Sequence, residues 1–467
     1  MPDAMMPHND ILRAIANDAN ARFIEQHAAD DVGALALQQA QRKDIDLAFC
    51  LTQIAGRQQA RNKLPTWAAQ MQLLFPPRLN MEQCSSETTA RYKAQLFTNL
   101  AHTALNNTTH LQLVDATGGF GVDFVNIATA LQADNSLPTM TAHYADTDDT
   151  LCALARHNFP LLGVDNAVIH HDDGMEVLRQ VSREALQQGH SVMLMIDPSR
   201  RDDHGQRTYD IAQCTPDVEQ LHDELCALAP CSIIKLSPMV DWHDAVNRLP
   251  ATKQVHIIST KNECKELLVV LLPHSQQPLT IHTINDDQHF VYTPDEKQLP
   301  TPSAPIPLIA SLEALAQACH TQKVFLYEPN ASVMKAGCYD EVAQHYGITP
   351  LATMSHLFVA DHDIPHFVGR RFVIDNVLPT NRKTLRRALQ GIQQANVFDK
   401  PNEQNEACFN SAMARKRRQQ ANVAVRHFPM TANELQQRMG VNDGGDIYIF
   451  GTTLANNDHI VIVARKA

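Results

Sequence analysis

Three glycines, Gly118, Gly119 and Gly121, follow a short apolar run that ends at Asp115. Helix-forming sequence resumes directly after them, from Val122 onward. Glycine lets the backbone turn sharply and approach a ligand closely, and a helix that starts there offers its free N–H groups. This stretch therefore predicts a site for a nucleotide-type ligand at the carboxyl end of a strand.

Two common ligands of glycine-rich turns fit this stretch poorly. A dinucleotide-binding turn would need a third Gly or Ala at the position of Phe124. A P-loop would need Gly-Lys followed by Ser or Thr, which is absent from the stretch. The glycines alone therefore do not identify the ligand.

Acidic residues stand at the ends of three further apolar runs. Asp146 ends the second run, Asp172 and Asp173 end the third, and Asp197 ends the fourth. A carboxylate after the second strand can accept both hydroxyl protons of a ribose, and one after the third can reach an adenine amine. Because an open α/β sheet binds its ligand at the carboxyl ends of its strands, we expect these positions to meet in one site.

Short apolar segments alternate with helical segments between residues 111 and 260, which is typical of a doubly wound parallel sheet. We expect its strands at Leu111–Asp115, Thr141–Ala145, Ala167–His170, Val192–Ile196, Ser232–Leu236 and Val255–Ser259. We expect the intervening helices at Val122–Ala133, Asp149–Asn158, Met175–Gln188 and Asp217–Leu228.

A chain of 467 residues is too long for one ordinary core, and the sequence predicts four parts. These are a helical domain (1–106), the α/β domain (107–280), a Pro-rich linker with a small α/β unit (281–372), and a basic α/β domain (373–467). In the third part we expect a helix at 311–319, a strand at 324–327 and a helix at 340–344. In the last we expect a hairpin from 446–451 to 459–464.

The net charge of −12 conceals an asymmetry. Residues 370–430 hold twelve Lys or Arg and four acidic residues, a balance of +8, which leaves −20 for the rest of the chain. Such polarity favours a polyanionic partner such as nucleic acid, and the alternative is a solvated helix face beside an acidic body.

The sequence also bears on where the protein is located and on whether it binds a metal. Residues 1–5 lack the basic start and apolar core of a secretory signal, and the apolar run Leu267–Leu272 is far too short to span a membrane. The ten cysteines form no Cys-x-x-Cys pair, and no histidine falls at zinc-site spacing with them. We therefore expect a cytoplasmic protein with reduced thiols, no metal and no membrane partner.

The glycines and strand-end acids together resemble the class I S-adenosylmethionine-dependent methyltransferases. Their first motif has an acid, one spacer and three alternating glycines, and here Thr117 replaces the first glycine. The resemblance implies that Asp115, Thr117 and the backbone of Gly119 and Gly121 face the methionine part of S-adenosyl-L-methionine. It also implies ribose contact by Asp146 and adenine contact by Asp173 or Asp172.

A longer set of motifs resembles one bacterial family of class I methyltransferases that carries a ferredoxin-like segment and a C-terminal THUMP-like domain. The motifs are Cys84–Lys93, Asp115–Asp123, Ile196–Arg201, Lys235–Pro238, Asn262–Leu267, Tyr327–Ala331, Met334–Gly337 and Arg426–Pro429. The resemblance implies a Rossmann-like sheet of seven strands with its last strand antiparallel. THUMP-type domains of other enzymes bind RNA, mainly tRNA, and the basic segment at 370–430 fits that analogy.

The segment Asp197-Pro198-Ser199-Arg200-Arg201 is where methyl transfer is expected. We assign catalytic roles to Asp197, Pro198 and Arg200. Methyltransferases that act on amines have Asp/Asn-Pro-Pro-aromatic here, with the aromatic stacked on a flipped base, so Ser199 and Arg200 weaken that interpretation. Arg200 and Arg201 could hold a substrate phosphate, or they could pair with Asp202 or Asp203.

An Asp-Pro-x-Arg segment is also similar to that of uridine C5 methyltransferases. Those enzymes need a cysteine nucleophile just after the next strand. Ser237-Pro238 stands there instead, and Cys231 lies at the wrong end of the strand. Covalent C5 chemistry is therefore disfavoured.

Further substrate contacts are expected from residues outside this segment. Tyr92 and Lys93 precede the first strand, and by resemblance they lie near the cofactor mouth. The alternative is that Tyr92 packs the helix and Lys93 is solvated. The remaining candidates are the basic residues Arg415, Arg417, Arg418 and Arg426.

The sequence thus favours a methyltransferase that uses S-adenosyl-L-methionine and acts on tRNA or rRNA. One alternative is a methyltransferase of a small molecule or a protein, with the C-terminal parts as scaffold. Another is an RNA-binding protein without catalysis that keeps a vestigial cofactor fold. The intact strand-end acids argue against such decay.

Overall fold

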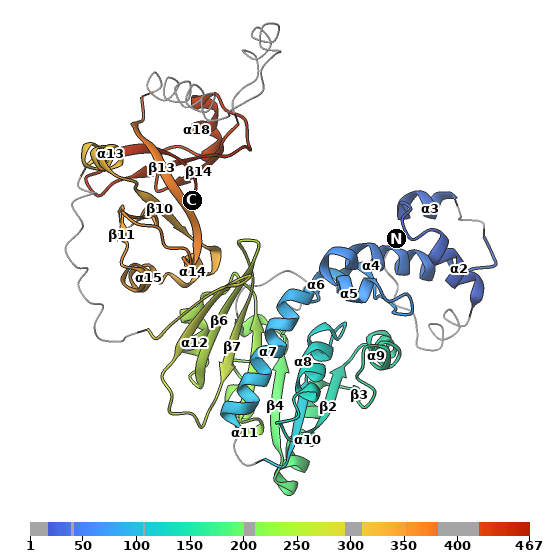
Figure 1. The fold of residues 1–467 in the computed structure, drawn as a ribbon. Helices are drawn as coiled ribbons and strands as arrows, with labels where there is room; N and C mark the ends of the chain where they lie inside the picture. The colour runs from blue at the N-terminus through green and yellow to red at the C-terminus, as the bar shows by residue number, and fades with distance from the viewer. Residues whose placement is uncertain are drawn as a thin grey trace. The chain divides into compact units, whose positions relative to one another are not determined.

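The computed structural model describes residues 17–38, 42–105, 108–199, 211–294, 311–352, 354–381 and 420–467 (Figure 1). The chain forms two compact units, one of residues 1–258 with 265–280 and one of residues 259–264 with 281–467. The finer division into four domains stays a prediction. Among the described residues, no helix is both long and apolar enough to cross a membrane.

The first unit is built on a twisted sheet with strand order β3-β2-β1-β4-β5-β7-β6. β1 pairs in parallel with β2 and β4, β4 pairs in parallel with β5, and β7 runs antiparallel to β5. These seven strands belong to a nine-stranded sheet and have the expected Rossmann-like arrangement, with β7 antiparallel. The strands are β1 (His110–Asp115), β2 (Thr139–Asp146), β3 (Val168–His171), β4 (Ser191–Ile196), β5 (Cys231–Leu236), β6 (Thr252–Thr260) and β7 (Glu263–Leu271).

Helices connect the parallel strands, and their starts follow from capping residues. Ser86 accepts the N–H of Thr89 at the start of α7, and Asp173 accepts two N–H groups at the start of α10. α7 and α8 lie side by side, and α8 buries Phe124 in the core (Figure 1). The helices are α7 (Glu87–Ala104), α8 (Val122–Ala133), α9 (Asp149–Leu161), α10 (Gly174–Gln188), α11 (His222–Leu228) and α12 (Trp242–Arg248). The helix expected at 217–228 thus starts later.

The N-terminal helices pack onto the same unit, since buried Phe23 and Phe49 share a cluster with Leu151 and Leu154 of α9. The guanidinium of Arg57 donates to four backbone carbonyls between Ala68 and Leu73, which fixes the turn after α5. The helices are α2 (Asp18–Gln26), α3 (Val32–Gln38), α4 (Leu47–Lys63), α5 (Pro65–Ala68) and α6 (Arg78–Gln83). The helical prediction for this part is confirmed in its described residues.

The second unit holds a sheet with strand order β11-β12-β10-β13-β16-β15-β14 and the hairpin β8–β9. α13 packs on one face of the sheet against Phe372 and Phe450, and α18 packs on the other against Ile449 and Val463. The strands are β8 (Thr280–Asn285), β9 (Gln288–Tyr292), β10 (Phe325–Pro329), β11 (Thr349–Pro350), β12 (Phe358–Ala360), β13 (Gly369–Pro379), β14 (Asn422–Arg426), β15 (Ile447–Thr453) and β16 (His459–Lys466).

The helices of the second unit are α13 (Leu312–Thr321), α14 (Ala331–Ala336), α15 (Tyr339–Tyr346) and α18 (Ala432–Met439). A capping box of Thr431 and Glu434 begins α18, and Gly440 ends it in the left-handed conformation. The predicted C-terminal hairpin is the antiparallel pair β15–β16. The α/β character expected of both C-terminal parts is therefore confirmed.

Candidate active site

A cavity of about 730 Å³ opens at the carboxyl edge of the first sheet. Its wall comes from α6 and the segment after it, from the turns that follow β1, β2, β3 and β4, and from Lys235 of β5. The predicted residues that line it are Asp115, Thr117, Gly119, Gly121, Asp146, Asp173, Asp197 and Pro198. The structure therefore brings together every cofactor candidate and two of the three catalytic candidates.

The glycine turn after β1 adopts a backbone that only glycine takes readily. Gly119 and Gly121 have φ angles of +56° and +81°, in the left-handed region. The N–H of Gly118 donates to the carbonyl of Ala145 at 2.9 Å, and the hydroxyl of Tyr144 donates to the carbonyl of Gly119 at 2.5 Å. The turn is thus anchored to β2, and Gly121 starts α8 at the cavity wall.

Thr117, which stands where a glycine is usual, links two parts of the site. Its N–H donates to Oδ1 of Asp115 at 3.1 Å, and its hydroxyl accepts the N–H of Asp197 at 2.6 Å. Asp115 is 4% exposed, and burial raises the pKa of its carboxyl to about 8. A cationic group bound in the cavity would stabilise this carboxylate.

The acids after β2 and β3 are oriented by backbone N–H groups. Asp146 accepts Gly119 N–H on Oδ2 at 2.8 Å and Asp148 N–H on Oδ1 at 2.9 Å, while burial raises its pKa. Asp173 caps α10 through Oδ1. Asp173 lines the cavity and Asp172 does not, so Asp173 is the better placed of the two for an adenine contact.

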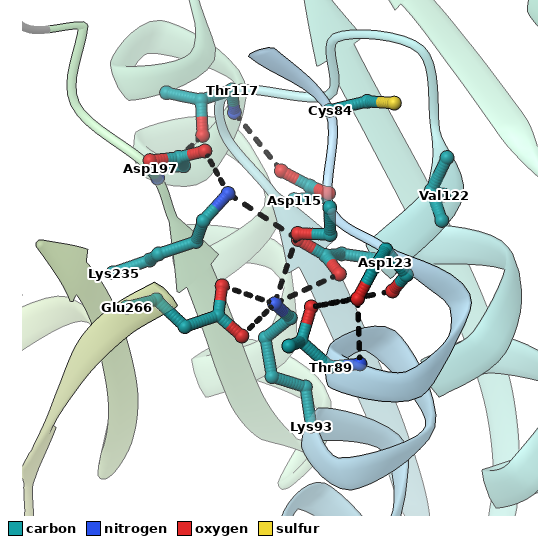
Figure 2. A network of polar contacts seen from close by, with 12 residues as sticks. Cys84, Thr89, Lys93, Asp115, Thr117, Val122, Asp123, Asp197, Lys235 and Glu266 are labelled. Atoms are coloured by element: carbon teal, nitrogen blue, oxygen red, sulfur yellow. Dashed lines mark hydrogen bonds and ion pairs between the residues drawn. The ribbon is translucent and has the colours of Figure 1, made fainter. Parts of the chain in front are cut away.

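A network of charged side chains lies against the cavity (Figure 2). Nζ of Lys235 lies 2.5 Å from Oδ2 of Asp197 and 3.8 Å from Oδ2 of Asp123. Nζ of Lys93 lies 2.7 Å from Oε1 of Glu266 and 3.1 Å from Oδ1 of Asp123. The network therefore joins α7, α8, β4, β5 and β7 through two ammonium groups and three carboxylates.

The pKa values in this network reflect its opposite charges. Burial alone would lower the pKa of Lys235, but the carboxylates of Asp197, Asp123 and Glu266 outweigh it and hold the pKa above its ordinary value. Burial alone would raise the pKa of Asp123, but the ammonium groups of Lys93 and Lys235 hold it below its ordinary value. Lys235 is therefore cationic and Asp123 anionic at neutral pH.

The structure corrects the expected positions of Tyr92 and Lys93, because neither lines the cavity. The hydroxyl of Tyr92 forms a hydrogen bond with Nδ1 of His256 at 2.7 Å, and burial raises its pKa. Lys93 is fully buried rather than solvated, and it also donates to Ser85 Oγ at 3.0 Å. Its charge is neutralised by carboxylates from α8 and β7, which no local pattern predicts.

Three charged residues of the network were missed as site residues from the sequence: Asp123, Lys235 and Glu266. Two of them carried a usable signal. Lys235 interrupts the apolar run of β5 at its carboxyl end, and Glu266 precedes the apolar run of β7. A charged residue in a buried strand needs a partner, and that requirement could have indicated them.

Six further predicted site residues remain, of which five are not described and the sixth is Arg426. Arg200, Arg201, Arg415, Arg417 and Arg418 lie outside the described residues. Arg426 ends β14 in the second unit, where its Nη2 lies 2.7 Å from Oε1 of Glu328.

Glu328 is 2% exposed and also accepts Nε of Arg370 at 2.7 Å. The guanidinium of Arg426 is thus committed to an ion pair that joins β14, β10 and β13. An RNA contact by Arg426 would therefore compete with an interaction inside the unit.

Residues 325–367 match a ferredoxin-like domain family, and residues 407–466 match a THUMP domain-like family. No curated protein matches the chain. A solved structure of a presumed methyltransferase from Porphyromonas gingivalis W83 is similar over 99% of this chain and 100% of its own, with 26% identity and a TM-score of 0.73.

Two further solved structures are similar over parts of the chain. An rRNA methylase from Streptococcus thermophilus is 15% identical over 38% of this chain and 93% of its own, with a TM-score of 0.24. Human methyltransferase-like protein 13, solved with S-adenosylhomocysteine, is 15% identical over 42% of this chain and 85% of its own, with a TM-score of 0.29. These two likenesses are too remote to carry an argument. The full-length likeness, the domain matches and the sheet order establish that the chain has the class I methyltransferase fold joined to ferredoxin-like and THUMP-like segments.

Proposed function

We propose that this protein is an S-adenosylmethionine-dependent methyltransferase that acts on RNA. The observation that carries the proposal is the cavity at the carboxyl edge of the sheet. All six residues predicted to bind the cofactor line it, together with Asp197. A fold kept only as scaffold would not need to preserve this set of groups in one place.

The groups that line the cavity suit this cofactor. S-adenosylmethionine carries a sulfonium, an ammonium and a ribose diol, and carboxylates favour all three. Asp115, whose pKa is raised to about 8, gains a counter-charge from a cationic ligand. Each oxygen of Asp146 accepts one backbone N–H and keeps a lone pair for a ribose hydroxyl.

The bound cofactor supplies a methyl group on a positively charged sulfur. The protein must then align an acceptor with that group and exclude water. Asp197 is placed for this task, because it stands at the end of β4, lines the cavity and is 37% exposed. Thr117 fixes its backbone, and Lys235 fixes its carboxylate.

RNA is favoured as the acceptor by the C-terminal part of the chain. Residues 407–466 match a THUMP domain-like family, and residues 370–430 carry an excess of positive charge. Lys and Arg that neutralise phosphates would give an affinity that falls steeply with salt. The competing acceptor is a small molecule or a protein.

Calorimetry with S-adenosylhomocysteine tests the cofactor assignment. The wild type is expected to bind, and Asp146→Ala is expected to bind more weakly by about 1–3 kcal/mol because a hydrogen-bonding carboxylate is lost. Asp287→Ala, a change in the β8–β9 turn outside the cavity, serves as the matched control. Absence of binding by the folded wild type would refute the enzyme assignment.

A gel-shift titration with tRNA tests the RNA assignment separately. Wild-type protein is expected to bind tRNA and slow its migration at low salt, and to release the tRNA as the salt concentration increases. Replacing Arg415, Arg417 and Arg418 with Gln should reduce the slope of log affinity against log salt, while S-adenosylhomocysteine binding stays unchanged. An affinity for tRNA that changes neither with salt nor with these substitutions would favour another class of acceptor.

A further inference from the structure

Lys235 and Asp197 place opposite charges side by side in the wall of the cavity. Their side chains are 12% and 37% exposed, and Nζ lies 2.5 Å from Oδ2. Because an ammonium has three N–H donors and a carboxylate has several acceptor positions, the pair can still both donate and accept. An acceptor group that touches both must therefore offer a proton and a lone pair close together.

The charge balance of the network identifies which group can take up a proton. Lys93 and Lys235 face three carboxylates, those of Asp123, Asp197 and Glu266, so one negative charge is in excess. Asp123 and Glu266 are 13% and 5% exposed and are held by Lys93. Asp197 is the most exposed of the three, and protonating it leaves the network neutral.

Among its described residues, the wall of the cavity offers no exposed aromatic ring on which a flipped base could stack. Phe120 is the single aromatic among the described lining residues, and it is 6% exposed. Its ring packs against Trp67 and Phe75, with centroids 5.0 and 6.0 Å away. Enzymes that modify a base often stack it on an aromatic ring, so the described lining favours an acceptor atom outside the base.

We propose that the methyl acceptor is a ribose 2′-hydroxyl of RNA, held between Asp197 and Lys235. A hydroxyl oxygen carries one proton and two lone pairs, which matches the paired acceptor and donor. The inference rests on the proposed function and adds the class of the reacting atom. Lys235 thereby becomes a catalytic residue alongside Asp197.

The chemical step balances with the groups present. The hydroxyl donates its proton to the carboxylate of Asp197, and the ammonium of Lys235 stabilises the negative charge that develops on oxygen. The oxygen forms a bond to the methyl carbon as the bond between that carbon and sulfur breaks. The electron pair of the broken bond stays on sulfur, which leaves a neutral thioether. Asp197 then returns its proton to solvent.

Lys93, Asp123 and Glu266 are positioning residues in this account. Lys93 is bound to Glu266 and Asp123, and Asp123 faces Lys235 (Figure 2). The carboxylates of Asp123 and Glu266 hold Lys235 cationic at the cavity wall, and Lys93 holds those two carboxylates in place.

The test uses the purified full-length protein, S-adenosylmethionine with a deuterated methyl group, and total RNA from cells that lack the gene. Nucleosides released from this RNA are analysed by mass spectrometry. A labelled methyl on ribose leaves with the sugar when the glycosidic bond breaks, whereas one on a base stays with the base. Label on ribose is the expected result, and a 2′-O-methyl group should also appear in dinucleotides that resist alkali.

The outcomes separate the inference from the proposed function. Label on a base would overturn the ribose acceptor and leave the RNA methyltransferase standing. No label in any nucleoside, from protein that binds S-adenosylhomocysteine, would overturn both. Once the labelled position is mapped, an oligonucleotide with 2′-deoxyribose there should accept no methyl group, and transfer to it would contradict the inference.

Variants test the two catalytic side chains. Asp197→Asn and Lys235→Met are each expected to slow single-turnover labelling by about 10²–10⁴-fold. Their binding of S-adenosylhomocysteine should stay close to that of the wild type, which also reports that they fold. Lys323→Gln, an exposed lysine of the second unit, should label at the wild-type rate.

Lys235→Arg keeps a cation with N–H donors and should recover part of the rate lost in Lys235→Met. An unchanged labelling rate in Lys235→Met would show that the ion pair has only a structural role.

Discussion

Two clusters of buried charge, one in each unit, differ in what surrounds them. In the first unit, Lys235 and Asp197 lie at the wall of a cavity, and the network carries one surplus carboxylate. In the second unit, Glu328 is enclosed by Arg370 and Arg426, and the surplus charge is positive. An open cluster with an exposed carboxylate can exchange protons with a ligand, whereas an enclosed one joins strands. Buried charged residues in the two units therefore differ in what they contact, a cavity in the first unit and neighbouring strands in the second.

The largest expected effect on stability comes from Lys93, at the buried end of the charged network in the first unit. Lys93→Met leaves Glu266 and Asp123 without their ammonium partner, so we expect a loss of about 3–5 kcal/mol in the free energy of unfolding. Urea denaturation measures it, with the exposed Lys323→Met as a control that should change little. A loss below about 1 kcal/mol, the range of surface pairs, would show that the network is not a buried unit.

Breaking the cluster of Glu328, Arg370 and Arg426 should reduce the free energy of unfolding by a smaller amount. Glu328→Gln removes the partner of two guanidiniums, but Arg370 and Arg426 are 41% and 33% exposed, so solvent screens their charges. We expect a loss of about 2 kcal/mol, measured by urea denaturation against Glu313→Gln. Binding of S-adenosylhomocysteine should not change. A weakened affinity would mean that this cluster also serves the cofactor site.

Ligand binding in the open cavity should also depend on pH. Burial raises the pKa of Asp115 to about 8, and the ammonium of the cofactor favours its ionised form. Below pH 8 a proton must leave before binding, so affinity for S-adenosylhomocysteine should weaken by up to about tenfold per pH unit. Calorimetry in buffers of different ionisation enthalpy should detect proton release between pH 6 and 8. Asp115→Asn should show neither effect, and a wild type without proton release would contradict the assignment.

The smallest effect is expected at the hydrogen bond beside the open cluster. Thr117→Val removes the oxygen that accepts the N–H of Asp197 at 2.6 Å, so we expect a loss of about 1 kcal/mol in stability. Thermal unfolding measures the change. Thr103→Val, an exposed threonine of α7 bonded within its own helix, is the comparison. An equal loss of stability in the two variants would show that the Thr117 hydroxyl contributes no more than an ordinary exposed threonine.

The sequence predicted the parts of the site that depend on local pattern. The glycine turn and the acids after consecutive strands follow from periodicity and composition, and the antiparallel last strand follows from the resemblance to class I methyltransferases. Gly119 and Asp146 meet because parallel strands bring their carboxyl ends to one edge.

The parts that were missed depend on contacts between distant segments. Lys93 and Glu266 are 173 positions apart in the chain, so neither neighbourhood indicates that the other neutralises it. Lys93 was expected at the cofactor mouth or in solvent, and it is buried in an ion pair. Arg426 was expected to bind RNA, and its charge is taken up by Glu328, 98 positions earlier.

The hydroxyl of Thr117 connects the turn that holds the methyl donor with the backbone of the residue that faces the acceptor. Any change in the position of one is therefore transmitted to the other through a single hydrogen bond. Thermodynamic reciprocity then applies: if the donor increases the affinity for the acceptor by some factor, the acceptor increases the affinity for the donor by the same factor. If the protein binds donor and acceptor as proposed, the threonine in place of the usual glycine would couple the two binding equilibria.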